Sequence, residues 1–138
     1  MKVHYMSESN EWTTPPEFFD KLNSKYKFTL DPCCTKESAL CNKYYTIEDD
    51  GLVQDWSDDV VFMNPPYGRV IGDWVRKAYK ESLKGAIVVC LIPARTDTKY
   101  WHKYIFPYAY KIDFIKGRLK FGDGKNYAPF PSAVVIFK

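Results

Sequence analysis

The most informative residues of this chain follow one another directly: Asn64, Pro65, Pro66 and Tyr67. The side-chain carbonyl of Asn64 and the backbone carbonyl of Pro65 can each accept a hydrogen bond, and the two prolines keep the turn stiff because their φ is fixed. Two such acceptors suit an –NH2 group conjugated to a planar ring, because holding both hydrogens favours the geometry in which the nitrogen lone pair can react. The ring of Tyr67 offers a face on which a planar group can stack.

A buried strand ending in a turn would position these four residues, because they come directly after the continuous apolar run 60–63. Apolar residues then recur at helical spacing over 70–83, and Gly85 is typical of a helix end. The run 86–92 predicts a second buried strand, which Pro93 ends. In sheets of this kind the ligand lies beyond the carboxyl ends of the strands.

The rest of the chain adds elements of both kinds. Asp31 follows a short apolar strand, so Asp31, Asn64 and the segment 93–95 are all expected at strand ends. Parallel strands that alternate with helices and close on an antiparallel C-terminal hairpin predict an α/β fold with a mostly parallel sheet. The further predicted helices cover 17–25, 36–43 and 97–105, and the further predicted strands cover 28–30, 111–116, 119–121 and 133–137.

Length and composition bound the function. The chain has 138 residues, of which 46% are hydrophobic and 27% charged, so we expect a flexible N-terminus over 1–10 and a single domain over 11–138. A net charge of +3 is compatible with a nucleic-acid partner without requiring one. The sequence has no apolar run of membrane-spanning length and no signal-peptide pattern, which predicts a cytoplasmic protein. Its four cysteines lack C-x-x-C spacing, so no metal site is expected.

The turn at 64–67 resembles the D/N/S-P-P-Y/F motif of the amino-methyltransferases, which act on adenine N6, cytosine N4 and some other planar amides and amines. A wider resemblance covers about residues 11–137 and is to the small phage-type, Dam-like DNA N6-adenine methyltransferases. The stretches that carry it, by their order and spacing, are Trp12-Thr13-Thr14-Pro15, Leu30-Asp31-Pro32-Cys33-Cys34, Asp49-Asp50-Gly51-Leu52, Asn64-Pro65-Pro66-Tyr67, Ile92-Pro93-Ala94-Arg95-Thr96-Asp97, Gly117-Arg118-Leu119-Lys120-Phe121 and Ala128-Pro129-Phe130-Pro131-Ser132-Ala133.

For the cofactor, the resemblance implies S-adenosylmethionine, bound by an abbreviated Rossmann-like methyltransferase sheet. The segment 12–15 would lie near its methionine part, and Asp31 would meet its ammonium group. Asp49 and Asp50 would reach the ribose hydroxyls, and Asp55 the adenine. The residues implied to bind the cofactor are Trp12, Thr13, Thr14, Pro15, Asp31, Pro32, Cys33, Asp49, Asp50 and Asp55.

These assignments have structural alternatives that the residues leave open. The segment 12–15 also suits a helix cap, and 49–51 also suits an exposed turn. The broader methyltransferase pattern has D-P-x-x-G-x-G after the first strand, whereas this chain has Cys33, Cys34 and Thr35 after Pro32. Small side chains permit a close approach of the backbone to a ligand less easily than glycines do.

For the substrate, the resemblance implies an adenine flipped out of double-stranded DNA. Asn64 and Pro65 would accept hydrogen bonds from its amine, within the turn that Pro66 stiffens, and Tyr67 would stack on the base. The chain has no room for a separate target-recognition domain, so the protein either recognises a short sequence or acts as a homodimer. The DNA contacts are expected from basic residues in loops, namely Arg69, Arg95, Lys116, Arg118 and Lys120, with Lys125 at the tip of a hairpin.

Two other functions stay open from the sequence. The same chemistry could act on cytosine N4, on adenine in RNA or on a protein glutamine amide, although Asn64 before the prolines favours adenine. The second alternative is a nucleic-acid-binding module that has lost catalysis, which the cysteines at 33 and 34 motivate. The place of action expected for a phage-type methyltransferase is the cytoplasm of a bacterial or phage-infected bacterial cell.

Overall fold

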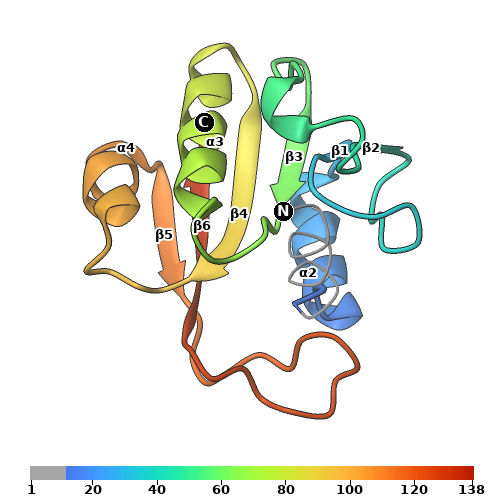
Figure 1. Cartoon of the computed structure of the whole chain (residues 1–138), viewed down its shortest axis with the longest axis vertical. Coiled ribbons are helices and arrows are strands. Elements are labelled where there is room, and N and C mark those ends of the chain that lie inside the picture. Colours follow the sequence, from blue (N-terminus) through green and yellow to red (C-terminus); the bar gives the residue numbers. More distant parts are fainter. Residues whose placement is uncertain (1–11) are drawn as a thin grey trace.

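A six-stranded sheet forms the centre of the molecule and confirms the predicted α/β fold (Figure 1). The computed structural model describes residues 12–138 of the chain. Across the sheet the strands are, in order, β2 (Lys43–Tyr44), β1 (Leu30–Asp31), β3 (Val60–Met63), β4 (Ile87–Pro93), β6 (Ser132–Phe137) and β5 (Lys111–Phe114). Strands β1 to β4 are parallel, and β6 is antiparallel to both β4 and β5. The sheet is therefore mostly parallel, with the antiparallel strands at its C-terminal end.

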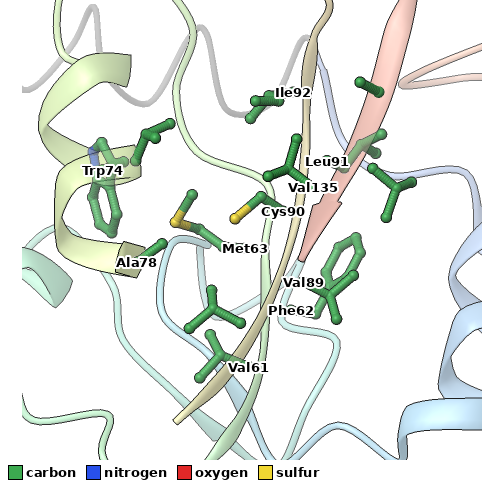
Figure 2. Close-up of a cluster of buried hydrophobic side chains, with 14 of the residues drawn as sticks. Val61, Phe62, Met63, Trp74, Ala78, Val89, Cys90, Leu91, Ile92 and Val135 are labelled. Atoms are coloured by element: carbon green, nitrogen blue, oxygen red, sulfur yellow. The ribbon is translucent and has the colours of Figure 1, made fainter. Parts of the chain in front are cut away.

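Two longer helices, α2 (Pro16–Tyr26) and α3 (Ile71–Leu83), cover opposite faces of this sheet. Strands β3 and β4 are almost wholly apolar and point successive side chains to the two faces, as strands that are covered on both sides do. Met63 lies on the same side of the sheet as Trp74 of α3 (Figure 2), whereas the neighbouring Phe62 meets Phe19 of α2 with 5.2 Å between ring centroids. The two helices together bury the strands that carry the predicted site.

Three short helical turns complete the described elements. They are the 3₁₀ turn η1 (Gly51–Val53), the π-helical turn η2 (Trp101–Ile105) and the single turn α4 (Phe106–Tyr108). The helix predicted over 97–105 therefore starts later than expected and continues to Tyr108. None of the helices within residues 12–138 is long and apolar enough to cross a membrane.

Two predicted elements are wrong. The segment 36–43 forms turns and then strand β2 instead of a helix, because the side chains of Thr35 and Ser38 bond to each other and to nearby backbone groups. The segment 119–121 forms no strand, because Leu119 accepts a hydrogen bond from Ala128 inside its own loop. The other predicted elements are present with boundaries shifted by a few residues.

The carboxyl ends of the parallel strands meet at one edge of the sheet, as the sequence predicts. Asp31 ends β1, Asn64 follows β3, and Pro93 ends β4. Because β6 is antiparallel to β4, it begins at this same edge, and the long loop 115–131 that leads into it runs past the strand ends (Figure 1). This edge therefore gathers residues from four separate parts of the chain.

Candidate active site

Asp31 contributes a buried carboxylate to a cavity of about 250 Å³. The residue is 3% exposed; Oδ1 accepts a hydrogen bond from the backbone N–H of Cys33 at 3.3 Å, and Oδ2 accepts one from Leu40 at 3.1 Å. Burial raises the pKa of this carboxyl from 3.8 to about 7, and the two N–H groups only partly oppose the rise. Within residues 12–138 no lysine or arginine forms an ion pair with it. The carboxylate therefore suits a cationic ligand.

The cavity brings together several of the residues that the sequence assigned to cofactor and substrate. Its lining consists of Thr13, Thr14, Pro16, Asp31, Cys33, Cys34, Ser38, Leu40, Phe62, Asn64 and Gly122. Sequence reasoning missed Ser38 and Leu40, which lie in the segment that was expected to be helical. It also missed Gly122, which reaches the cavity from the loop 115–131 and donates its N–H to the carbonyl of Thr13 at 3.1 Å.

Asn64 is fixed at both ends of its side-chain amide. Its Nδ2 donates to the backbone carbonyl of Trp12 at 2.7 Å and to Oγ1 of Thr14 at 3.0 Å. Its Oδ1 accepts a hydrogen bond from the hydroxyl of Tyr67 at 3.0 Å. The segment 12–14 and the turn 64–67 are thus joined directly, which the sequence did not indicate. Pro65 and Pro66 between Asn64 and Tyr67 are buried.

Tyr67 lies inside an aromatic cluster and is only 4% exposed. The indole of Trp12 lies roughly parallel to its ring, with centroids 6.3 Å apart and planes at 21°. Phe121 and Phe130 meet the same ring edge-on, at 6.4 Å and 5.5 Å. Burial raises the pKa of the Tyr67 hydroxyl, which therefore stays protonated and able to donate. Stacking of any planar ligand on Tyr67 requires one of these rings to move.

The aromatic cluster of Trp12, Tyr67, Phe121 and Phe130 also borders a second cavity. This space has a volume of about 570 Å³ and shares Gly122 with the first cavity. Its lining residues are Trp12, Phe121, Gly122, Asp123, Asn126, Tyr127 and Pro129. Sequence reasoning gave no role to Phe121 or Phe130, although aromatic side chains flanked by glycine and proline in a polar loop were a signal that could have found them.

The three acidic residues expected to reach the ribose and adenine do not line the first cavity. Asp49 accepts hydrogen bonds from the backbone N–H and the hydroxyl of Thr46, and Asp50 accepts one from Leu52. Asp55 is exposed, and hydrogen bonds from Ser57 lower the pKa of its carboxyl to about 2. The contacts of Asp49 and Asp50 fit the turn-forming alternative, and a role of all three residues toward the cofactor stays a prediction.

The remaining expected cofactor residues are structural neighbours of the cavity. Pro32 is buried, and its carbonyl closely approaches Gly51, where an added Cβ would come within 2.2 Å of the oxygen. Pro15 precedes α2, and its carbonyl accepts a hydrogen bond from Phe19 at 3.1 Å. The close approach at Gly51 explains why the stretch 49–52 needs a glycine.

The basic residues expected to contact DNA are all exposed, and they come from the loops at the carboxyl edge of the sheet. Arg95 lies over the ring of Phe130, with 5.4 Å between its guanidinium carbon and the ring centroid. Arg118 donates to the carbonyl of Ala128 at 3.3 Å. Their contact with DNA stays a prediction, and the exposed set is Arg69, Arg95, Lys116, Arg118 and Lys120.

Three known proteins are similar to this chain over much of its length. It is 32% identical over 120 residues to a DNA N-6-adenine-methyltransferase of Escherichia phage T1, and the aligned residues cover 85% of this chain and 50% of the relative. It is 28% identical over 97 residues to a DNA N-6-adenine-methyltransferase of Haemophilus phage HP1, and the aligned residues cover 69% of this chain and 56% of the relative. It is also 36% identical over 73 residues to the putative methyltransferase YfdM of Escherichia coli (strain K12), and the aligned residues cover 47% of this chain and 80% of the relative.

The chain thus spans about half the length of the two phage relatives it matches. A family model described as DNA N-6-adenine-methyltransferase (Dam) matches residues 4–133, a range that includes the cavity at Asp31, the turn at Asn64 and the aromatic cluster. This match agrees with the strand-end geometry and with the resemblance carried by the sequence motifs. The chain therefore belongs to the Dam family of DNA N6-adenine methyltransferases.

Proposed function

We propose that this protein transfers a methyl group from S-adenosylmethionine to the N6 amine of an adenine flipped out of double-stranded DNA. The observation that carries the proposal is the position of Asn64. Its side-chain amide lines the same cavity as the buried carboxylate of Asp31, so a group that accepts from an amine and a group that attracts a cation face one space.

The residues of this cavity fit the amino-acid end of the cofactor. Asp31 has no cationic partner among residues 12–138, and its raised pKa reports a carboxylate short of solvation, which the ammonium group of S-adenosylmethionine would supply. The hydroxyls of Thr13 and Thr14 offer hydrogen bonds to the adjoining carboxylate. The bound cofactor supplies a methyl group on a positively charged sulfur.

The turn would hold the amine in line with this methyl group. Asn64 Oδ1 and the carbonyl of Pro65 would accept the two amine hydrogens, which favours the geometry in which the nitrogen lone pair can react. As the amine held by Asn64 and Pro65 takes up the methyl group it would become positively charged, and it would then release one proton to water. The two carbonyl oxygens also stabilise the positive charge that develops on nitrogen.

The base would reach the turn through the second cavity. The ring of Tyr67 is the stacking face in this proposal, and the indole of Trp12 occupies a parallel position in the structure. An entering adenine would displace this indole and exchange one stacked ring for another, which reduces the cost of opening the site. The 570 Å³ cavity beside Trp12 would give the base a route of entry once the indole moves.

DNA would lie across the loops at the carboxyl edge of the sheet. The exposed side chains of Arg69, Arg95 and Arg118 and of the nearby lysines would bind phosphates, and the loop 115–131 would read a short site. A homodimer would double this surface, and sedimentation with and without DNA distinguishes it from a monomer. With such a substrate, the protein would act in the cytoplasm of a bacterial or phage-infected bacterial cell.

The direct test is to incubate the protein with S-adenosylmethionine and mixed-sequence duplex DNA, and then to identify the methylated nucleosides by mass spectrometry. We expect N6-methyldeoxyadenosine from the wild type and from Asn42→Ala, which makes the same change at an exposed turn. We expect none from Asn64→Ala. N4-methyldeoxycytidine instead would keep the chemistry and correct the base, and product only with RNA or protein would correct the substrate class. DNA binding without methylation of any of these substrates would favour a binding module.

A further inference from the structure

We propose that the carbonyl of Trp12 and the hydroxyl of Thr14 hold the side-chain amide of Asn64 in one of its two orientations, which makes Thr14 a positioning residue for methyl transfer. The inference rests on the proposed function, because it concerns how the amine acceptor is kept ready. It assigns to the segment 12–14 a task beyond binding the cofactor.

The orientation of Asn64 matters because the two ends of an amide have nearly the same shape and opposite hydrogen-bonding character. Only Oδ1 can accept a hydrogen bond from an adenine amine; a rotated side chain would present its own NH2 group and place two donors against each other. An aspartate, which the D/N/S motif also allows, has two equivalent oxygens and needs no such control. An asparagine at this position therefore requires partners that distinguish its ends.

The contacts of Asn64 do distinguish them. The carbonyl of Trp12 cannot donate a hydrogen bond, so the atom that faces it at 2.7 Å must be the NH2 group. Thr14 Oγ1 accepts the second hydrogen of this group at 3.0 Å. At the other end, the Tyr67 hydroxyl donates to Oδ1 at 3.0 Å, which leaves a lone pair of that oxygen for the substrate. The carbonyl of Trp12 decides the orientation, and the two hydroxyls, which can donate or accept, complete the hydrogen bonds in that orientation.

The segment that provides the two acceptors is itself fixed by its neighbours. The carbonyl of Thr13 accepts a hydrogen bond from Gly122 in the loop 115–131. The segment 12–14 then leads through Pro15 into the helix α2. Because only the backbone of Trp12 is used, the indole can leave Tyr67 while the carbonyl stays on Asn64. The orientation of Asn64 is thus compatible with entry of the base.

The test compares Thr14→Val, which keeps the shape of the side chain and removes the oxygen, with Thr14→Ser, which keeps the oxygen. We expect the kcat for methylation to fall about tenfold in the valine variant, the range for one lost hydrogen bond, and to stay within about twofold of wild type in the serine variant. Thr29→Val removes a hydroxyl that bonds Asp59, away from the site, and should leave kcat unchanged. Any of three results would overturn the proposal. These are an unchanged kcat in Thr14→Val, an equal loss of kcat in Thr14→Ser, and an effect of Thr14→Val confined to a higher KM for S-adenosylmethionine.

A second measurement does not depend on methylation and so separates this inference from the proposed function. In nitrogen-15 NMR spectra, the side-chain amide signal of Asn64 is identified by its absence from Asn64→Asp. Its hydrogens should exchange with solvent more slowly than those of the exposed Asn42, and the protection should fall in Thr14→Val but not in Thr29→Val. Exchange as fast as that of Asn42 in the wild type would refute the orientation, whether or not the protein methylates DNA.

Discussion

The hydroxyl of Tyr67 donates a hydrogen bond to Oδ1 of Asn64 over 3.0 Å, so the proposed stacking residue also contacts the proposed amine acceptor. The ring and the hydroxyl of Tyr67 can therefore be tested separately. We expect Tyr67→Phe to lower kcat about three- to tenfold, because one neutral hydrogen bond to Asn64 is lost. Tyr67→Ala should lower it much further, because the ring that would stack on the base and fills the cluster is also lost. Single-turnover kinetics with both variants measure the difference, and equal losses would mean that the hydroxyl alone matters.

Replacement of Asn64 should separate chemistry from cofactor binding. Asn64→Ala removes the acceptor of the amine, so methylation should become undetectable. The affinity for S-adenosylmethionine should change less than about threefold, because the residues proposed to hold the cofactor's charged end, Asp31 and Thr13, are untouched. Isothermal titration calorimetry on the variant measures this affinity. A collapse of binding together with activity would contradict the role given to Asn64.

The buried carboxyl of Asp31 should make cofactor binding depend on pH. Its pKa is raised to about 7, so it is largely protonated at pH 6 and ionised above about pH 8. In the proposed function the cofactor's ammonium binds the ionised form, so affinity should rise as the pH increases through about 7 and then level off. Burial also raises the pKa of the Cys34 and Cys41 thiols, to about 12 for Cys41, so neither titrates in this range.

Calorimetric titrations between about pH 5.5 and 8.5 test this dependence. Asp31→Asn should bind more weakly at pH 8 and lose the rise in affinity near pH 7. The raised pKa of Asp31 has the opposite effect on the stability of the protein without cofactor. An unfolded aspartate titrates near 4, so between about pH 4 and 7 the folded chain binds a proton that the unfolded chain does not. The free energy of unfolding therefore falls as the pH rises over this range. The Asn variant should lack this decrease. A wild-type affinity independent of pH would place the ammonium elsewhere.

The close approach at Gly51 predicts a strong effect on stability. An alanine Cβ there would lie 2.2 Å from the carbonyl oxygen of Pro32 and 3.1 Å from the Trp74 ring, so Gly51→Ala forces the backbone apart. We expect a loss of about 3 kcal/mol in the free energy of unfolding, measured by urea denaturation. Gly72→Ala is the matched control, because its nearest neighbour would be Tyr100 at 3.7 Å and alanine favours the helix. It should leave the stability equal or slightly higher.

Much of this site could be predicted because it depends on local sequence. The apolar run that forms β3 stops at Asn64, just before two prolines, and the longer run that forms β4 stops at Pro93, so these strand ends, and with them Asn64, could be placed from the sequence alone. Asp31 was found by the same logic. What could not be predicted depends on contacts between distant residues. The hydrogen bond from Leu40 to Asp31 and the contact of Asn64 with Trp12 have no signature in either local stretch.

Buried Glu81 is a further example. It lies on the helix α3 with a lysine four residues before it and another three after it, which is the pattern of an exposed helix surface. In the structure it is buried, because its carboxylate accepts the backbone N–H of Trp56 from a loop 25 residues earlier in the chain. The burial of Glu81, and with it its role in the fold, therefore depends on the path of that loop, which is a tertiary feature.

The antiparallel direction of β6 has a practical consequence for protein engineering. Because β6 starts at the carboxyl edge and runs the other way, Lys138 lies at the opposite edge of the sheet from Asn64 (Figure 1). Six residues of β6 span about 20 Å at about 3.4 Å per residue. A DNA-reading module fused after Lys138 to direct methylation to a chosen sequence would therefore need a linker that returns along at least this length, whereas a fluorescent or affinity tag fused there would leave the strand ends uncovered.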